Sequence, residues 1–303
     1  MATAALPLLP ADRLGPLAAD YARVRRAEGL RLAVAGLVVL LLAVLSARVA
    51  DVDPALLWDR GGAFFGYFGR ILTLESGAHA GQWVWHDPAE WFWGLGRWLL
   101  LLGDTVLMAY VGTLLGCTGG FVLGLLSAAN IVPSAPLRWG VKRLLEFCRT
   151  VPEVVFALVF VIAFGLGPLP GVLALAIHTL GAQGKLFSEV VENIDMKPVE
   201  GAQAAGASWT QMARFAVVPQ VLPGFFSYAL LRFEINVRGA AVLGFVGAGG
   251  IGQDLVEAVR KFYYNDVAAL LVLIILTVTL IDTATSVLRR RLLLPAESGG
   301  GRA

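Results

Sequence analysis

The sequence predicts an all-α membrane protein with about six transmembrane helices. Hydrophobic residues make up 57% of its 303 residues and charged residues only 15%, whereas soluble domains carry roughly 25% charged residues. A soluble chain of this length forms an ample core without such an excess of apolar side chains, so the excess must face lipid. The apolar residues also gather in runs of about 20, the length at which a helix crosses a bilayer.

Six stretches are long and apolar enough, or nearly so, to form spanning helices: about 31–49, 104–128, 144–165, 170–190, 213–237 and 266–287. The first and the last are the most uniformly apolar. The middle four carry Gly, Ser, Thr and isolated charges, as helices that pack on one another should. Small residues let helix backbones approach closely in a bilayer, so the second stretch is expected to pack through its glycines: Gly112, Gly116, Gly119, Gly120 and Gly124.

Lysine and arginine are distributed unevenly among the connecting segments, and this predicts the orientation in the membrane. One alternate set of segments holds most of them: Arg23, Arg25, Arg26, Arg31, Arg138, Lys142, Arg143, Lys197, Arg214, Arg289, Arg290 and Arg291. The other set holds mainly Arg60, Arg70, Arg97, Arg260 and Lys261. Both termini and the Glu200 loop are therefore predicted to lie on the cytoplasmic side of the membrane. No cleavable signal peptide is apparent, so the first span is expected to be retained.

These patterns divide the chain into four parts. We expect a cytoplasmic tail at 1–30, a first span with an extracytoplasmic aromatic segment at 31–103, a five-helix core at 104–290 and a cytoplasmic tail at 291–303. The aromatic segment holds six of the eight tryptophans and further rings: Trp58, Trp83, Trp85, Trp91, Trp93, Trp98, Phe64, Phe65, Tyr67 and Phe68. Aromatic side chains concentrate at the headgroup level, so one or two helices are expected to lie along the outer surface. Docking of a partner is the alternative.

The loop at 195–212 has a local sequence that predicts a short helix, a bend and a second helix at the cytoplasmic face. Pro198 and Glu200 suit the first turn of a helix. Gly206 can end that helix in the left-handed conformation, and Ser208 and Gln211 have capping-box spacing for the next one. Small residues give the first helix a thin profile that could enter a groove: Gly201, Ala202, Ala204 and Ala205.

This loop resembles the one by which permease subunits of ATP-driven (ABC) importers grip their ATPase. Glu200, Ala202 and Gly206, followed after a spacer by Val218-Pro219, match the spacing of that coupling loop. Gly201 stands where Ala is commoner and Ala216 where Ile is usual; both remain small or apolar. Further segments between about 100 and 290 resemble the phosphonate permease family and its methionine-importer-like relatives, a group of type I importers: 149–153, 165–169, 184–189, 232–238 and 243–252.

The resemblance implies a multi-pass permease subunit, in the inner membrane of a bacterium, of an importer for phosphonate, phosphite or phosphate. It implies three kinds of partner: an ABC ATPase dimer that holds ATP and Mg²⁺, an extracytoplasmic substrate-binding protein, and a second permease copy, identical or paralogous. The residues expected to couple to the ATPase are Glu200, Gly201, Ala202, Ala205, Gly206, Ser208 and Pro219. The chain itself is expected to hold no cofactor or metal, to catalyse no reaction and to bind no nucleic acid.

Charged side chains at membrane depth are costly and usually face a pathway or a partner. Glu234 and Arg238 are spaced to pair on one helix face, and Arg232 and Asn236 form a second such set of positions. Two interpretations stay open: a network that changes between transport states and meets an anion, or a structural ion pair. Arg149 and Glu153 could likewise form an inner gate or anchor a helix end. His178 lacks an identifiable facing acid, and Asp282 is expected to cap a helix or to pair with the Arg289 cluster.

The glycine-rich segment 247–252 predicts a break in a membrane helix. Gly247, Gly249, Gly250 and Gly252 formally match a dinucleotide-binding pattern, but that site requires a preceding strand and a later acid that are not expected here. A half-helix starting near Ile251 could present free amides to an anion, and close helix packing is the alternative.

Two other functions compete with an ABC permease. A gradient-driven secondary transporter of a small anion calls for paired broken helices in two repeats, and the sequence contains one glycine-rich break and no clear repeat. A membrane enzyme is disfavoured because no H-E-x-x-H, P-loop or Ser/His/Asp set is found. His79 and His86 lack a third metal ligand at suggestive spacing, and Cys117 and Cys148 are expected to be small buried hydrophobes.

Overall fold

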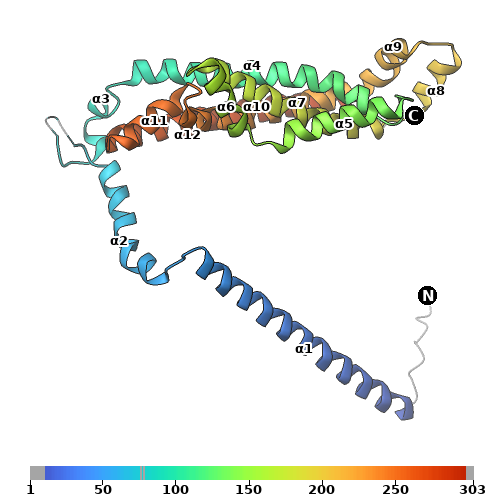
Figure 1. The fold of residues 1–303 in the computed structure, drawn as a ribbon, viewed down its shortest axis with the longest axis horizontal. Coiled ribbons are helices and arrows are strands. Elements are labelled where there is room, and N and C mark those ends of the chain that lie inside the picture. Colours follow the sequence, from blue (N-terminus) through green and yellow to red (C-terminus); the bar gives the residue numbers. More distant parts are fainter. Residues whose placement is uncertain (1–10, 76, 78, 298–303) are drawn as a thin grey trace, which may run out of the picture. The chain divides into compact units, whose positions relative to one another are not determined.

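A computed structural model describes residues 11–75, 77 and 79–297 of the chain. Within these ranges the fold is helical, with one isolated β-bridge between Thr73 and Trp83, which confirms the predicted fold class (Figure 1). The elements in chain order are α1 (Ala11–Val49), α2 (Pro54–Ile71), η1 (Val84–His86), α3 (Pro88–Trp91), α4 (Leu95–Ser127), α5 (Ala135–Thr150), α6 (Glu153–Phe164), α7 (Pro168–Glu192), α8 (Lys197–Ala204), α9 (Trp209–Met212), η2 (Ala213–Val217), α10 (Val218–Leu243), η3 (Gly244–Val246), α11 (Ile251–Arg260) and α12 (Tyr264–Glu297).

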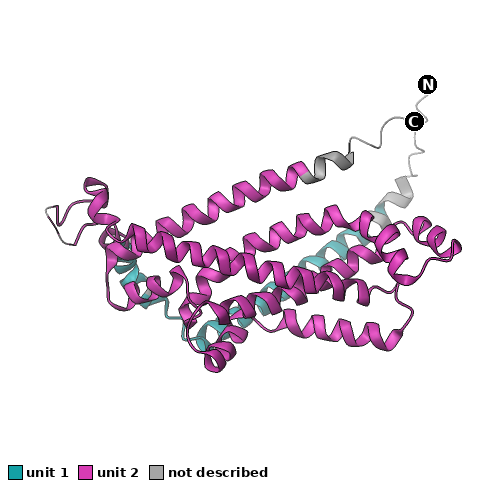
Figure 2. Ribbon diagram, turned by 90° about the horizontal axis from the view of Figure 1, so that it is seen from above, with its two compact units in different colours: residues 1–67 teal, residues 68–303 magenta. Residues whose placement is uncertain are grey.

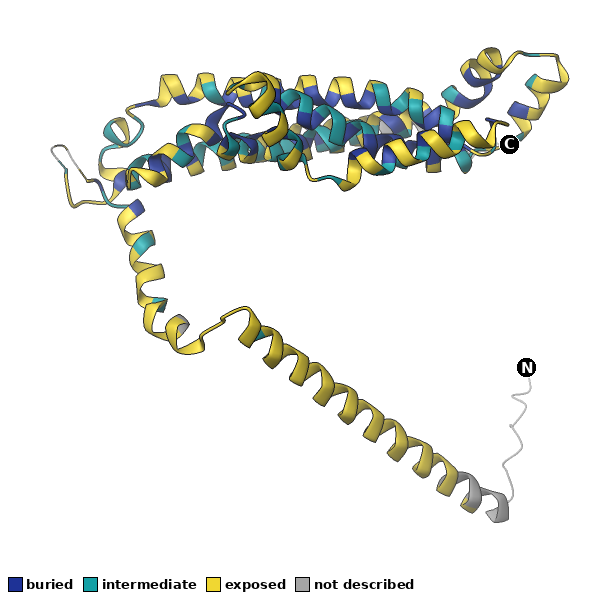
Figure 3. Ribbon diagram, in the orientation of Figure 1, coloured by how far each residue is buried: buried dark blue, intermediate teal, exposed yellow. Residues whose placement is uncertain are grey.

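The chain forms two compact units, residues 1–67 and 68–303 (Figure 2). In the first unit, the stretch Ala19–Val49 of α1 is long and apolar enough to cross a membrane, and none of its most apolar window is buried within the chain (Figure 3). Apolar side chains exposed on every side of a helix indicate lipid contact. The first predicted span is therefore confirmed, and the helix also includes residues 11–30 of the predicted cytoplasmic tail. The predicted segment 31–103 falls in both units.

The second unit is a helix bundle with α7 near its centre. α7 packs against α4, α5, α6 and α10, and its contact with α4 is the most extensive of all helix pairs. The predicted glycine face of α4 lies in this contact. A Cβ atom added to Gly116 would lie 2.6 Å from the Ala176 carbonyl oxygen, and one added to Gly120 would lie 2.9 Å from the Gly184 nitrogen. Glycine thus sets how closely α4 and α7 approach.

Among the described residues, three helices are long and apolar enough to span a membrane, or five if each of two bent helix pairs counts as one span. α4 and α12 qualify in the bundle, and the bent pairs are α5 with α6 and the helix from Trp209 to Val246 with α11. α7, which contains the predicted span 170–190, does not qualify alone. Its polar residues are tolerable because neighbouring helices cover it.

The third predicted span, 144–165, is not one helix. α5 ends at Thr150, α6 begins at Glu153, and the two are bent by 86°. Pro152 explains the break, because proline disfavours helical conformation in the preceding residue and lacks an N–H group of its own. The charged residues Glu146, Arg149 and Glu153 also lie on or beside this break.

Candidate functional site

The predicted coupling loop, residues 195–212, lies at the end of the bundle marked by α8 and α9 in Figure 1. Asp195 accepts a hydrogen bond at 3.0 Å from the Lys197 N–H at the start of α8. Gly206 has φ +80°, and the N–H of Ala207 donates to the Ala202 carbonyl at 3.0 Å. The left-handed helix end predicted at Gly206 is therefore present.

The second predicted helix of this loop is present but short. The Ser208 N–H donates to Gln211 Oε1 at 2.8 Å as part of a capping box, and α9 follows. Residues Ala213–Val217 then form a π-helical segment that leads into α10 at Val218. Sequence patterns did not foresee this wider turn, a form that is rare and often found at functional positions.

The coupling loop presents one exposed face and one anchored face. Val199 is fully buried and Met212 nearly so, both in an apolar cluster with Phe187 of α7. Of the predicted coupling residues, Ala202 is half-buried and the others are exposed: Glu200, Gly201, Ala205, Gly206, Ser208 and Pro219. A Cβ added at Gly201 or Gly206 would meet nothing within 4 Å. The exposed face is therefore thin and unobstructed by the chain itself.

The segment between α4 and α5 braces this loop. Trp209 Nε1 donates to the Ile131 carbonyl at 3.0 Å, and Asn130 Nδ2 donates to the Val191 carbonyl at 2.8 Å. Glu192 accepts the Ala129 N–H at 2.9 Å and pairs with Lys142 at 3.0 Å. The sequence analysis missed this role, although the polar Asn130 between two apolar stretches was a visible signal. The loop is thus tied to the α4–α5 segment, which is itself bonded to α7, and Asp195 exchanges two hydrogen bonds with Gln220 of α10.

A layer of polar side chains crosses the middle of the bundle. Asn236 Nδ2 of α10 donates at 2.8 Å both to Thr113 Oγ1 of α4 and to Thr179 Oγ1 of α7. Arg232 Nε approaches the same Thr179 oxygen at 3.5 Å. Thr113 lies 18 residues into α4, about 27 Å at a rise of about 1.5 Å per residue. We call this set the polar layer. Its members lie on α4, α7 and α10, three helices that all pack on one another.

Glu153 and His178 extend the polar layer to α6. His178 Nε2 lies 3.6 Å from Glu153 Oε2, and its Nδ1 lies 3.2 Å from the Val151 carbonyl oxygen. Glu153 is therefore the facing acid that the sequence analysis could not find for His178. Arg149 is exposed on the other side of the bend, and no ion pair joins it to Glu153 among the described residues. The structure thus gives Glu153 a different partner from the one its spacing suggested.

The charges on α10 pair with α12 and not with each other, which corrects the expected Glu234–Arg238 pair. Thr285 Oγ1 donates to the buried Glu234 carboxylate, and Arg238 Nη2 lies 3.4 Å from the Asp282 carboxylate. Asp282 therefore pairs with Arg238 instead of the Arg289 cluster. Four-residue spacing identifies residues on one face of a single helix, but the closer partners of Glu234 and Arg238 lie on the neighbouring helix α12.

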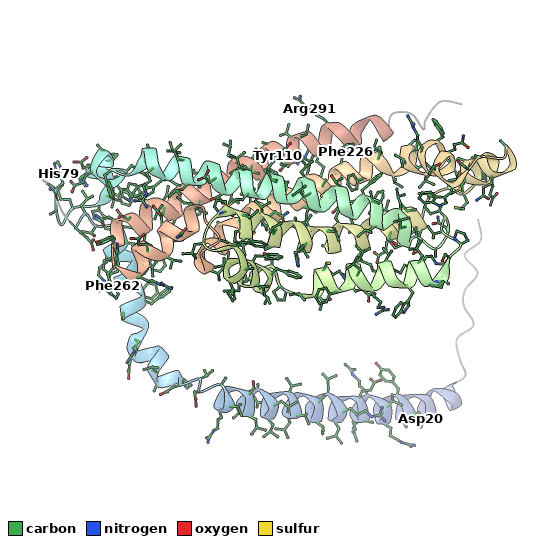
Figure 4. All side chains as sticks on the ribbon, turned by 45° about the horizontal axis from the view of Figure 1, so that its top comes forward. Asp20, His79, Tyr110, Phe226, Phe262 and Arg291 are labelled. Atoms are coloured by element: carbon green, nitrogen blue, oxygen red, sulfur yellow. The ribbon has the colours of Figure 1, made fainter. Side chains whose placement is uncertain are left out.

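An apolar groove lies beside this contact between α10 and α12. Tyr110 and Phe226 (Figure 4) line a cavity of about 500 Å³ between α4, α10 and α12, and Thr285 reaches its wall. Arg232 and Arg238 do not line it. The groove therefore has the character of a lipid- or protein-contacting surface, separate from the charged pairs.

The glycine-rich segment breaks the helix at the opposite end of the bundle from α8, as predicted. Gly247, Gly249 and Gly250 have φ +82°, +81° and +76°, and α11 starts at Ile251 at 46° to the preceding helix. The Ile251 N–H is not free for an anion, because it donates to Thr105 Oγ1 at 2.9 Å. A Cβ on Gly252 would lie 1.8 Å from the Ala241 carbonyl oxygen. Close packing, the alternative interpretation, accounts for these glycines.

The aromatic segment meets the bundle at the same end. Trp93 Nε1 donates to Asp266 at 2.9 Å and Arg97 pairs with Asp254 at 2.9 Å. Trp83 and Trp85 stack with ring centroids 5.2 Å apart and remain exposed. Trp98, expected among the interfacial rings, is instead buried at 3% exposure in an apolar cluster with α11 and α12.

Asp87 caps α3 and faces a histidine. It accepts the Glu90 N–H at 3.1 Å and lies 3.4 Å from His79 Nδ1. The Glu90 N–H, with His79 adding to it, lowers the pKa of this carboxyl. Among the described residues, no group of three or more His, Cys, Asp or Glu side chains is arranged to hold a metal ion.

Comparison with known proteins places this geometry in a family. Residues 120–293 match the model of the family described as binding-protein-dependent transport system inner membrane component. The chain is 44% identical over 200 residues to the phosphite transport system permease protein of Stutzerimonas stutzeri, covering 66% of this chain and 72% of that protein. It is 51% identical over 121 residues to a putative cryptic phosphonate transport system permease protein of Escherichia coli, covering 40% of this chain and 99% of that protein.

The fold matches a solved transporter. An inward-facing structure of the MetNI methionine ABC transporter superposes with a TM-score of 0.57 at 23% identity, covering 68% of this chain and 98% of that chain. The matched family segment contains the coupling loop, most of the polar layer and the glycine-rich break. This chain therefore belongs to the inner-membrane component family of binding-protein-dependent transport systems, the permease subunits of ABC importers.

Proposed function

We propose that this protein is the permease of an importer for a phosphorus oxyanion, namely phosphonate, phosphite or phosphate. Relatives that transport phosphite and phosphonate by name support the substrate class. The observation that carries the mechanism is the coupling loop. At Gly201 and Gly206 its thin outer face leaves open space among the described residues, while Val199 and the brace at Asn130 hold it firmly to the bundle.

A loop built in this way can transmit motion. ATP binding closes a separate ATPase dimer, and α8 moves with it. The loop is tied to α10 by two hydrogen bonds between Asp195 and Gln220 and to the α4–α5 segment by Trp209. Asn130 of that segment is in turn bonded to α7, so the movement is passed to the spans. Two permease copies then rock from inward- to outward-open, and a loaded binding protein releases its anion between them. This chain carries no nucleotide site in the proposal, so hydrolysis belongs to the ATPase.

The orientation follows from the same assignment. The coupling loop must face the ATPase in the cytoplasm, and the basic residues near both termini agree with a cytoplasmic location for them. The aromatic segment and the glycine-rich break then face outward, toward the binding protein. From here on, the α8 end of the bundle is called inner and the α11 end outer.

Reconstitution in liposomes tests this function. The chain is combined with the partner ATPase and binding protein that the proposal requires, and ATP hydrolysis and anion uptake are measured with phosphite, phosphate and methylphosphonate. The proposal predicts that one of these anions stimulates hydrolysis and accumulates inside. Uptake that proceeds without the ATPase but collapses with the ion gradient would establish the secondary-transporter alternative.

A further inference from the structure

Arg238 and Asp282 differ from the rest of the charged groups at mid-bundle because they lie on its surface. Their side chains are 53% and 40% exposed, whereas Glu234 and Asn236 on the same helix are buried. Asp282 lies 18 residues into the 34-residue α12, about 27 Å along it at about 1.5 Å per residue. The exposed pair therefore lies well inside the candidate membrane span Tyr264–Arg291, near the level of Thr113, to which the neighbouring Asn236 donates.

An exposed charge at this depth cannot face hydrocarbon. A charged side chain at the bilayer centre costs about 2.5–3.5 kcal/mol or more and in practice faces a water-filled cavity or another protein surface. Arg238 lies in an exposed stripe of α10 with Leu231, Ile235 and Val242. Within that stripe it is the single charged residue. This side of α10 therefore borders the aqueous path or the partner that lines it.

The contact between Arg238 and Asp282 is loose. The same nitrogen, Nη2, lies 3.4 Å from each carboxylate oxygen, while charge-assisted hydrogen bonds of this kind measure about 2.7–2.9 Å. Among the described residues, the remaining guanidinium donors of Arg238 have no acceptor. A guanidinium presents planar donors that match the oxygens of a phosphorus oxyanion.

We propose that Arg238 is the cation that the transported oxyanion contacts midway through the membrane, with Asp282 as its competing counter-ion. The proposal rests on the function proposed above. In the empty path, Asp282 keeps Arg238 paired. An arriving anion displaces the carboxylate, and the carboxylate in turn displaces the anion. A translocation site must bind well enough to admit its substrate and weakly enough to release it, and a loose internal competitor meets both requirements.

The test uses the full importer in liposomes and the purified permease alone. For Arg238→Gln we expect uptake at saturating loaded binding protein to fall by about tenfold or more, as the loss of a charge-assisted hydrogen bond predicts, while Arg238→Lys retains part of it. Phosphorus NMR line broadening of phosphite by the permease without binding protein should disappear in Arg238→Gln. It should increase in Asp282→Asn, because the competitor is gone.

A double variant separates binding from mere structure. If the pair only neutralises charge, Arg238→Gln combined with Asp282→Asn leaves no unpaired charge and restores uptake, and this result would overturn the proposal. If Arg238 contacts the anion, the double variant stays as defective as Arg238→Gln. Arg260→Gln is the control, because Arg260 is exposed at the end of α11, and an equal loss there would also overturn the proposal.

Failure of the wild-type importer to use ATP is distinguishable from failure of this site. Without ATP-driven uptake by the wild type, the proposed function is wrong, yet phosphite broadening still tests the site. With wild-type uptake intact and Arg238→Gln unchanged, the site alone is wrong.

Discussion

Glycines at the two ends of the bundle serve opposite purposes. In the inner coupling loop, Gly201 and Gly206 have open space where a side chain would stand, whereas at the outer break Gly250 and Gly252 are pressed against Thr105 and the Ala241 carbonyl. The outer glycines are required by this chain's own packing. The inner ones leave room for something outside the chain. The same residue type thus marks an internal contact at one end and, under the proposed function, the contact with the ATPase at the other.

The largest expected effect is at the inner end. Glu200→Arg replaces the acid that is expected to meet the ATPase by a base, so that like charges would face each other across the contact. Such a juxtaposition costs several kcal/mol, which corresponds to a loss of uptake of about a hundredfold or more. Gly206→Trp should act similarly by bulk. Membrane abundance should stay normal in Glu200→Arg, because Glu200 is exposed, and should fall at most modestly in Gly206→Trp, where there is open space but φ is +80°.

Gly206→Asn is the matched control, since asparagine tolerates positive φ better than most residues. It should keep most of the uptake activity. Normal transport by both Glu200→Arg and Gly206→Trp would remove the coupling assignment.

The next effect is at the outer end and concerns stability. Gly252→Ala puts a methyl group 1.8 Å from the Ala241 carbonyl oxygen, and overpacking of this kind costs about 1–3 kcal/mol. We expect the thermal midpoint of the purified protein to fall, with a proportional loss of folded yield. An unchanged midpoint would mean that the two helices separate easily at the break.

A smaller loss of stability is expected for a change in the polar layer, which lies between the two ends. Asn236→Leu removes the hydrogen bonds to Thr113 and Thr179, each worth about 0.6 kcal/mol and at most about 1.7 kcal/mol in a membrane protein. The midpoint should fall by less than in Gly252→Ala. Val237→Leu, one residue away, controls for altered volume, and a fall as large in that variant would mean that packing and not hydrogen bonding is measured.

The smallest effect has the opposite sign. Gly201→Ala lies in helix α8 with open space around it, and replacing glycine by alanine in a helix stabilises it by about 0.5–1 kcal/mol. The thermal midpoint should rise slightly or stay level, and uptake should persist, because an added methyl group meets nothing within 4 Å among the described residues. A clear fall would show that Gly201 needs its own flexibility, and the contrast between the two ends would weaken.

Signals that depend on nearby residues were predictable from sequence. The left-handed Gly206, the capping box of Ser208 and Gln211, and the helix break at 247–252 all follow from local backbone preferences, and the structure has each of them. Their chemistry is contained in a few consecutive residues, so no knowledge of the fold was needed.

Partners that come from distant elements were not predictable. Glu234 and Arg238 were paired by spacing, but the packing of α12 supplies Thr285 and Asp282 instead. The burial of Trp98 likewise depends on α11 and α12. The bend before Glu153 is a different case. Its proline was visible in the sequence, but the apolar character of most of 144–165 favoured a single span despite the charges at Glu146, Arg149 and Glu153.

Protection of the coupling loop by the ATPase tests the central claim most directly. A cysteine placed at Ala205 would be exposed, while the native Cys117 and Cys148 are buried. Its rate of reaction with a maleimide would be measured with and without the ATPase subunit, beside a control cysteine at the exposed Gln253 of α11. The account predicts slower labelling at position 205 and no change at position 253 when the ATPase is bound. Equal labelling at position 205 with a bound ATPase would contradict it.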